Sequence, residues 1–267
     1  MPPESKVTKR LRTWVNTPMA LLVSERWIIG ICLGMLVALA WWWLTQTEFS
    51  MGDMAPMPMA GDVWTFSYLM SAFAMWALMM VAMMLPSAMP MILLYARFSE
   101  RSGGNTTNTI LFTFAYLLVW LLFSGLATVT QAALVATALL SHSDVSLADS
   151  RLSGALLIAA GCYQLSPLKS ACLNLCRSPL SFVMRFWRPG WKGGLRLGLV
   201  HGLYCLGCCW VLMFLLFVGG VMNLVWIAIL TLIVLAEKFT PRSIRVRQTI
   251  GVLLILGGIS LGIGAKI

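Results

Sequence analysis

Four side chains that can bind a soft metal ion lie within one apolar stretch of the sequence. The stretch runs from Leu195 to Val218 and is long enough to form a membrane-spanning helix. At about 100° of rotation per helical residue, positions i, i+4, i+7 and i+8 share one stripe. Thiolate and imidazole groups suit Cu(I) and Zn(II), and thiolates favour Cu(I) most. The four residues are His201, Cys205, Cys208 and Cys209.

A single stripe along a helix cannot surround one ion. A pair such as Cys205 and Cys208 would offer two ligands, and further ligands would come from another helix. Cysteine and glycine also serve as small packing residues between membrane helices, so close packing is the alternative explanation. Three of the seven cysteines lie within five residues, with an intramembrane histidine on the same face, and this density favours a metal or redox site.

Methionine is concentrated between Met51 and Met91. A loop containing proline and glycine follows the first apolar segment, and its methionines are not obvious core residues. A thioether is a neutral soft ligand for Cu(I) that needs no deprotonation. We expect the loop to capture metal outside the cell, with apolar filling of a membrane-surface loop as the alternative. The proposed capture residues are Met51, Met54, Met57 and Met59.

The second apolar segment carries methionines at helical spacing. Met75, Met79 and Met83 follow one another at intervals of four residues and share one helix face. We expect them to meet His201 and the cysteines of the 195–218 segment, although packing is a common role for such a stripe. Nearby prolines each remove a backbone donor and kink the helix. Carbonyls freed at membrane depth are typical of a site or cavity buried in protein.

A second pair of thiols lies near the predicted cytoplasmic face. Cys172 and Cys176 are one helical turn apart, after Pro167, which breaks or kinks the helix. Two thiols at this spacing can bind one soft ion in near-linear geometry if their rotamers converge. The nearby Lys169 and Arg177 would favour the thiolate form. The alternative is that both are small interfacial residues.

The composition is that of a polytopic membrane protein. Of 267 residues, 60% are hydrophobic and only 10% are charged, and the mean hydropathy is +0.86. The partner implied is the lipid bilayer. The net charge of +10 does not indicate nucleic-acid binding, because the basic residues lie in short loops between apolar segments.

The fold expected is an all-α, polytopic membrane helical bundle of about seven transmembrane helices. A basic segment at 1–26 precedes a single transmembrane domain at 27–265. Each crossing takes about 20 apolar residues. The predicted segments are approximately 27–44, 64–95, 110–139, 152–172, 195–218, 221–236 and 249–265.

Charge alternates between successive loops and predicts an orientation. Basic loops remain on the cytoplasmic side of a bacterial inner membrane. The N-terminus is therefore predicted to be cytoplasmic, as are 97–109, 173–192 and 237–248. The loops 45–63 and 140–151, together with the C-terminus, are predicted to be outside.

Several of these motifs together resemble a known family. Their combination is similar to the bacterial predicted metal-binding integral membrane proteins, sometimes labelled copper chaperones, and the resemblance covers most of residues 64–260. It implies metal handling without fixing an activity. The motifs are Met75-Trp76, Met83-Met84-Leu85-Pro86, Gly161-Cys162-Tyr163-Gln164, Pro167-Leu168-Lys169, Cys172 to Pro179, His201-Gly202, Cys205 to Trp210, and Glu237-Lys238.

The sequence favours a binding protein over an enzyme. We expect it to bind Cu(I) and hand it on, inward from the outer methionines through the membrane to Cys172 and Cys176. The reverse direction would load a copper-dependent membrane or periplasmic enzyme. The alternatives are a metal-dependent membrane oxidoreductase, or an accessory subunit of one, and a structural scaffold. The chain contains no nucleotide-binding motif, which excludes a copper-transporting ATPase.

Overall fold

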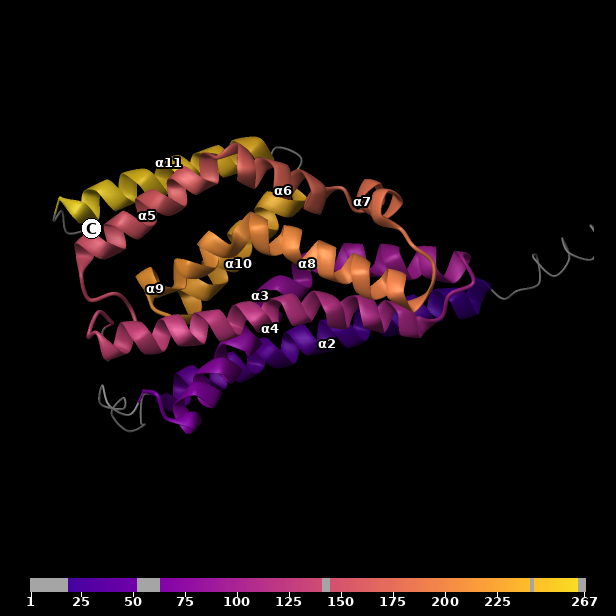
Figure 1. Cartoon of the computed structure of the whole chain (residues 1–267), viewed down its shortest axis with the longest axis horizontal. Helices are drawn as coiled ribbons and strands as arrows, with labels where there is room; N and C mark the ends of the chain where they lie inside the picture. The colour runs from indigo at the N-terminus through magenta and orange to yellow at the C-terminus, as the bar shows by residue number, and fades with distance from the viewer. Residues whose placement is uncertain (1–18, 52–62, 141–144, 241–242, 264–267) are drawn as a thin grey trace, which may run out of the picture.

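The computed structural model describes residues 19–51, 63–140, 145–240 and 243–263. Within these ranges the chain is almost entirely helical and contains no β-strand, so the all-α prediction is confirmed. The helices, with the labels of Figure 1, are α2 (Met19–Met51), α3 (Phe66–Arg101), α4 (Thr106–Ala136), α5 (Ser150–Leu165), α6 (Pro167–Arg177), α7 (Pro179–Phe186), α8 (Gly190–Phe214), α9 (Leu216–Gly219), α10 (Leu224–Phe239) and α11 (Ser243–Gly262).

Five stretches in the described ranges are long and apolar enough to cross a membrane. They lie in α2, α3, α4, α8 with α9, and α11. Helices α5 and α6 pass the same test only as a pair bent by 62°, which raises the number to six. Helix α10 has 16 residues, fewer than the roughly 20 that a straight crossing takes. A multi-pass membrane protein is compatible with these helices, and the number seven stays a prediction.

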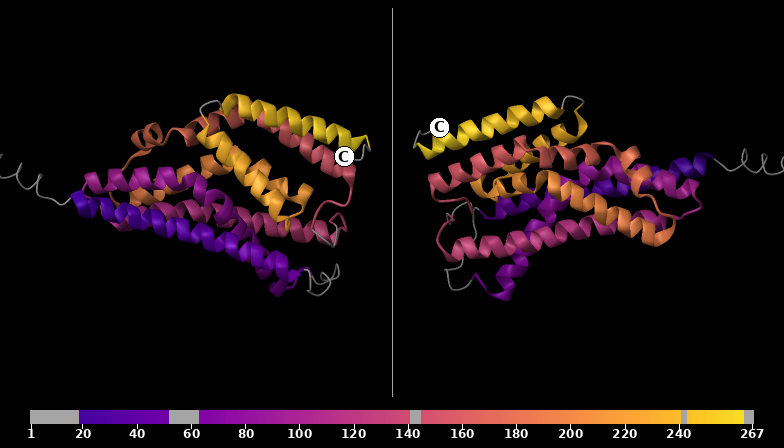
Figure 2. Two further views of the ribbon diagram at one scale, coloured as in Figure 1. Left: turned by 180° about the vertical axis from the view of Figure 1, so that it is seen from behind. Right: turned by 45° about the horizontal axis from the view of Figure 1, so that its top comes forward.

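The helices form two groups with α10 between them (Figures 1 and 2). Helix α3 packs against α2 and α4, and α4 also packs against α8. Helix α5 lies along α11 in every view. Helix α10 contacts α3, α6, α8 and α11 and so connects the two groups.

Glycines allow the closest helix pairs to approach. A Cβ at Gly198 of α8 would collide with the Phe112 carbonyl of α4. A Cβ at Gly154 of α5 would lie 2.6 Å from the Gly258 carbonyl of α11. Small residues of this kind let membrane helices pack backbone to backbone. Gly198 therefore serves close packing between α8 and α4. This packing does not account for the cysteines that follow it on α8.

Helix α3 continues through both of its prolines, and side chains use the exposed carbonyls. Pro86 removes the donor that would pair with the Ala82 carbonyl. The Trp41 indole Nε1 donates to that oxygen at 3.3 Å. The Met84 carbonyl accepts from the Tyr116 hydroxyl at 3.1 Å. Side chains from α2 and α4 therefore bond to carbonyls of α3 close to Pro86.

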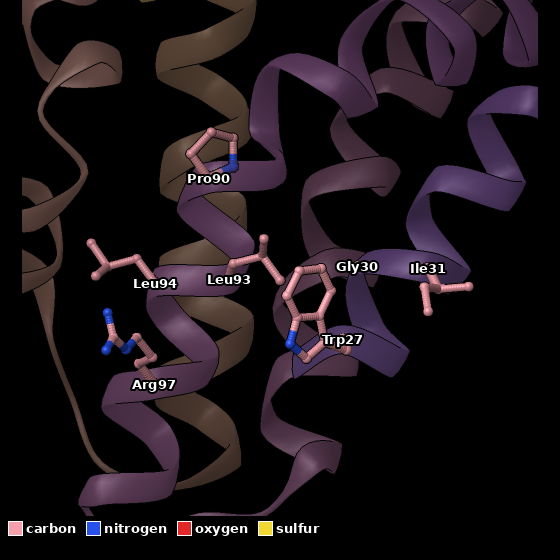
Figure 3. A pocket seen from close by; sticks show the side chains of 7 residues that line it. All are labelled: Trp27, Gly30, Ile31, Pro90, Leu93, Leu94 and Arg97. Atoms are coloured by element: carbon pink, nitrogen blue, oxygen red, sulfur yellow. The ribbon is translucent and has the colours of Figure 1, made fainter. Parts of the chain in front are cut away.

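A groove lies between α2 and α3 (Figure 3). Trp27 of α2 and Leu93 of α3 lie toward each other between the two helices, and Gly30, Ile31, Pro90, Leu94 and Arg97 complete the lining. None of its lining residues carries a thiol, thioether or imidazole. The groove therefore lacks the soft ligands of the predicted metal site, which lies elsewhere.

Candidate metal centre

Helices α6 and α8 bring four buried thiols together. We call Cys176, Cys205, Cys208 and Cys209 the thiol cluster; their exposed fractions are 9, 0, 2 and 1%. The side chains of Cys176 and Cys208 interact across the two helices. Cys176 was predicted to belong to a separate site near the cytoplasmic face. The structure instead places it beside the α8 cysteines, because α6 packs against α8 after the bend at Pro167.

Two α8 thiols point back toward the preceding helical turn. Cys208 Sγ donates to the Cys205 carbonyl at 3.1 Å, and Cys209 Sγ donates to the same oxygen at 2.9 Å. All seven cysteines are free, and Cys32 and Cys162 are exposed on the helix surfaces. The Cys205 carbonyl is therefore the shared acceptor of two thiols of the cluster.

Helix α3 supplies a thioether to the cluster. Met84 Sδ lies 3.8 Å from Cys209 Sγ, and Met84 is fully buried. The sequence analysis singled out Met75, Met79 and Met83 instead. Met79 and Met83 are buried and Met75 is half-buried, all within or against the core. Their role as ligands stays a prediction, whereas Met84 has a direct sulfur contact.

Helix α4 contributes a tyrosine that the sequence analysis missed. The Tyr116 hydroxyl lies 3.2 Å from Cys205 Sγ and donates to the Met84 carbonyl at 3.1 Å. A buried tyrosine hydroxyl needs such partners. Helix α4 also buries Trp120 and Gln131, so sequence alone offered no means of choosing Tyr116.

A lysine of α10 completes the surroundings of Cys205. Lys238 Nζ lies 3.0 Å from Cys205 Sγ and donates to Ser87 Oγ at 2.8 Å. The predicted apolar segment ended at residue 236 and left Lys238 in a loop, and this loop assignment was wrong. Helix α10 extends through Phe239, which keeps Lys238 on the helix and directs it into the protein. Only 7% of the residue is exposed.

His201 is buried without a polar partner. It is 2% exposed, and neither Nδ1 nor Nε2 has a hydrogen-bond partner. The rings of Phe112, Tyr116 and Phe182 surround it at centroid distances of 6.2, 5.6 and 5.3 Å. An unpaired buried nitrogen is unfavourable by about 1–3 kcal/mol and calls for an explanation. A metal ion bound by His201 and by Cys205, one helical turn away, would explain the unpaired nitrogens.

The cluster has the ligand types for a soft ion, but it is not closed around one. Among the described residues, no three His, Cys, Asp or Glu side chains already converge as a metal site. The thiols instead engage a carbonyl, Tyr116 and Lys238. Metal binding would exchange some of these hydrogen bonds for metal–sulfur bonds, because thiols bind metal as thiolates.

A family model described as PpoB2, copper chaperone, matches residues 73–261. The chain belongs to the PpoB2 copper chaperone family. The match includes the whole thiol cluster, Met84, Tyr116 and Lys238. It confirms the resemblance found in the sequence and supports copper handling in general. Neither the curated proteins nor the solved structures gave a match.

A buried ion pair fixes the bend of this PpoB2-family protein. Lys169 Nζ lies 2.7 Å from Glu237 Oε2, and the Gln164 amide bonds to both side chains. Lys169 is 0% and Glu237 2% exposed. Lys169 is thus paired with Glu237, and its effect on Cys172 and Cys176 stays a prediction. This pair joins the α5–α6 bend to α10.

Arginines near the bend bind backbone carbonyls. Arg177 donates to the carbonyls of Lys238 and Thr240, the latter at 2.7 Å. Arg247 of α11 donates to the Gln164 carbonyl at 2.8 Å. Arg177 was expected to favour thiolates of α6, yet these contacts direct it to the end of α10. Both arginines hold the helix ends that carry Lys169 and Lys238.

The remaining predicted ligands are less closely associated with the cluster. Cys172 is half-buried, and a Cβ at Gly207 would lie 3.1 Å from its sulfur. It therefore packs against α8 beside the cluster, and joint binding with Cys176 stays a prediction. Met51 ends α2, and no position is described for its side chain. Met54, Met57 and Met59 lie outside the described residues.

Proposed function

We propose that this PpoB2-family protein binds Cu(I) as cargo inside the membrane and hands it on. The observation that carries the proposal is the burial of the α8 thiols with a thioether 3.8 Å from Cys209. Soft thiolate and thioether ligands select Cu(I) over harder ions. Membership of a copper chaperone family supports the same cargo.

The mixture of ligands favours copper over a structural zinc site. Structural zinc is held by four cysteine or histidine ligands in a closed tetrahedron. Here thiols are combined with a methionine. Neither ring nitrogen of His201 has a hydrogen-bond partner, so either one could bind an ion. Cys205 and Cys208 serve as the core ligands, and Cys209, Met84 and His201 complete the set as the ion arrives or leaves.

The transfer order runs from outside to inside. Methionines of the outer loop capture the ion, and methionines of α3 pass it toward α8. The Met84–Cys209 contact is the point where α3 meets the thiols. Cys176, which interacts with Cys208, receives the ion next, and Cys172 lies one turn away. The same series of ligands in reverse would load a copper-dependent enzyme outside.

The membrane placement is also part of the proposal. The protein spans a bacterial inner membrane several times, with its N-terminus in the cytoplasm. Apolar side chains on the outer face of α4 support contact with lipid; Ile110, Leu122 and Leu126 are 61, 69 and 57% exposed.

Copper loading of the full-length protein tests the proposal. The protein is purified in detergent without oxygen, loaded with Cu(I) and freed of unbound ion. We expect stoichiometric copper with the X-ray absorption edge of Cu(I) and sulfur as the dominant neighbour. A variant with Cys32 and Cys162 changed to Ala should bind the same amount, because both residues are exposed outside the cluster. Folded protein without copper, or copper bound only by nitrogen and oxygen, would refute the proposal.

A further inference from the structure

Lys238 is a buried cation whose polar contacts carry no carboxylate. Its Nζ contacts Cys205 Sγ at 3.0 Å and Ser87 Oγ at 2.8 Å. The adjacent Glu237 is already engaged by Lys169 and Gln164. A charge buried in a membrane protein is unfavourable unless an opposite charge lies nearby. The position of Lys238 is therefore unusual unless the thiols beside it bind as anions.

The charges of an occupied site can be counted from these residues. Two bound thiolates, Cys205 and Cys208, carry two negative charges. Lys238 carries one positive charge, and a monovalent ion supplies the second. A neutral His201 or the Met84 thioether adds none. The sum is zero for a monovalent ion and one excess positive charge for a divalent ion.

Other charged groups near the cluster do not alter the difference of one charge between a monovalent and a divalent ion. Lys169 and Glu237 form a pair that is neutral in itself. Arg177 and Arg247 donate to backbone carbonyls of Thr240 and Gln164, and their positive charges are the same whichever ion is bound. The low dielectric of a buried site makes an unbalanced charge expensive. Lys238 is the cation in direct contact with a thiol of the cluster.

We propose that Lys238 makes the thiol cluster selective for monovalent soft ions. Its ammonium group supplies one of the two positive charges that balance two thiolates, so a monovalent ion completes the balance and a divalent ion exceeds it by one. This inference rests on the proposed copper function and adds the origin of its selectivity. Lys238 acts through Cys205 and is not itself a ligand. Its removal should therefore change the preference between ions more than it changes the ability to bind one.

Two sets of metal ions that have the same number of d electrons but different charges test the inference. Cu(I) and Zn(II) form one such set, and Ag(I) and Cd(II) form another. Affinities are measured by chelator competition on the detergent-purified full chain. In K238M and K238Q, the preference for the monovalent ion should fall on the order of a hundredfold, as expected for an unbalanced buried charge. K238R keeps the charge and should keep most of the preference. K192M removes an exposed lysine and should match the parent.

The wild-type protein gives a second readout that needs no variant. Its Ag(I)-over-Cd(II) preference should exceed that of a small dithiol, which has no ammonium group. An equal preference would overturn the inference, as would a K238M protein that binds Cu(I) with the parental preference. Absence of Cu(I) binding in the wild type would instead refute the proposed function, so the two failures are distinguishable.

Discussion

Cys205 is the residue at which the contacts of the site meet. Its sulfur contacts Tyr116 at 3.2 Å and Lys238 at 3.0 Å, and its carbonyl accepts from Cys208 and Cys209. These partners come from α4, α8 and α10. Changes at Cys205 should therefore affect copper binding more strongly than changes at any single methionine.

Replacing Met84 with Leu tests the thioether contact. The change keeps apolar bulk and removes the sulfur that lies 3.8 Å from Cys209. We expect the Cu(I) affinity to fall about tenfold, a scale typical for loss of one supporting partner at a metal site. Competition with a Cu(I) chelator measures it. Met80, 1% exposed on the same helix, provides the control; an equal loss in Met80→Leu would mean that packing, not ligation, is at issue.

The stripe of α8 was predictable at the residue scale because all four residues follow one helical period. His201 and the three α8 cysteines are all buried, as that stripe requires. Glu237-Lys238 was among the family motifs, but the contact of Lys238 with a thiol was not predicted, since Lys238 stands among basic residues that resemble a cytoplasmic loop. Only the position at which α10 ends shows that its side chain turns inward. Met84 was one of several equivalent methionines.

At the scale of elements, the bend between α5 and α6 determines where Cys176 lies. Ser166 caps α6 by accepting from the Lys169 amide at 3.2 Å, and Pro167 occupies the first turn. Both residues favour a helix start at this point. The helix then packs against α8 and carries Cys176 to Cys208.

Breaking the Lys169–Glu237 pair should destabilise this bend. Lys169→Met leaves a buried carboxylate unpaired, and we expect the free energy of unfolding to fall by about 3–5 kcal/mol. Reversible unfolding in mixed micelles measures the change. Adding Glu237→Leu removes the orphaned charge and should restore much of the loss. A double variant as unstable as the single one would show that the pair contributes net attraction rather than charge balance.

The long helices were predictable, and so was the position of the break at Pro167, but the size of the bend was not. The predicted segments 64–95, 110–139 and 195–218 correspond to α3, α4 and α8. Hydropathy treated 152–172 as one span, although the chain turns by 62° after Leu165. A window of apolar residues detects composition and not direction, so a bent pair looks like a single helix. The kink at Pro167 itself was correctly predicted.

For the whole molecule, the site lies where the two helix groups meet. Helix α10 lies between the α2–α3–α4–α8 group and the α5–α11 pair, and Lys238 reaches α3 and α8 from there (Figure 2). The four cysteines of the cluster are buried. Under the proposed function, an ion would reach them by exchange between neighbouring ligands.

Labelling of introduced cysteines tests the predicted orientation. Position 55 belongs to the loop that is predicted to be outside and lies beyond the described residues, and Lys192 is exposed at the start of α8. In a background with Cys32 and Cys162 changed to Ser, an impermeant thiol reagent applied from outside should label position 55. It should spare position 192 until the cells are opened, because basic loops stay cytoplasmic. The opposite pattern would reverse the transfer order.

Copper content of the Cys205→Ser, Cys208→Ser double variant tests the central claim most directly. Thiolates neutralise a soft cation in a dry site, which thioethers cannot do. We predict that the wild type and a Cys32→Ala control retain Cu(I) after removal of unbound ion, and that the folded double variant loses it. A triple variant in which Met75, Met79 and Met83 are changed to Leu should lose less copper than the double cysteine variant. Equal copper in the wild type and the folded double variant would contradict the account.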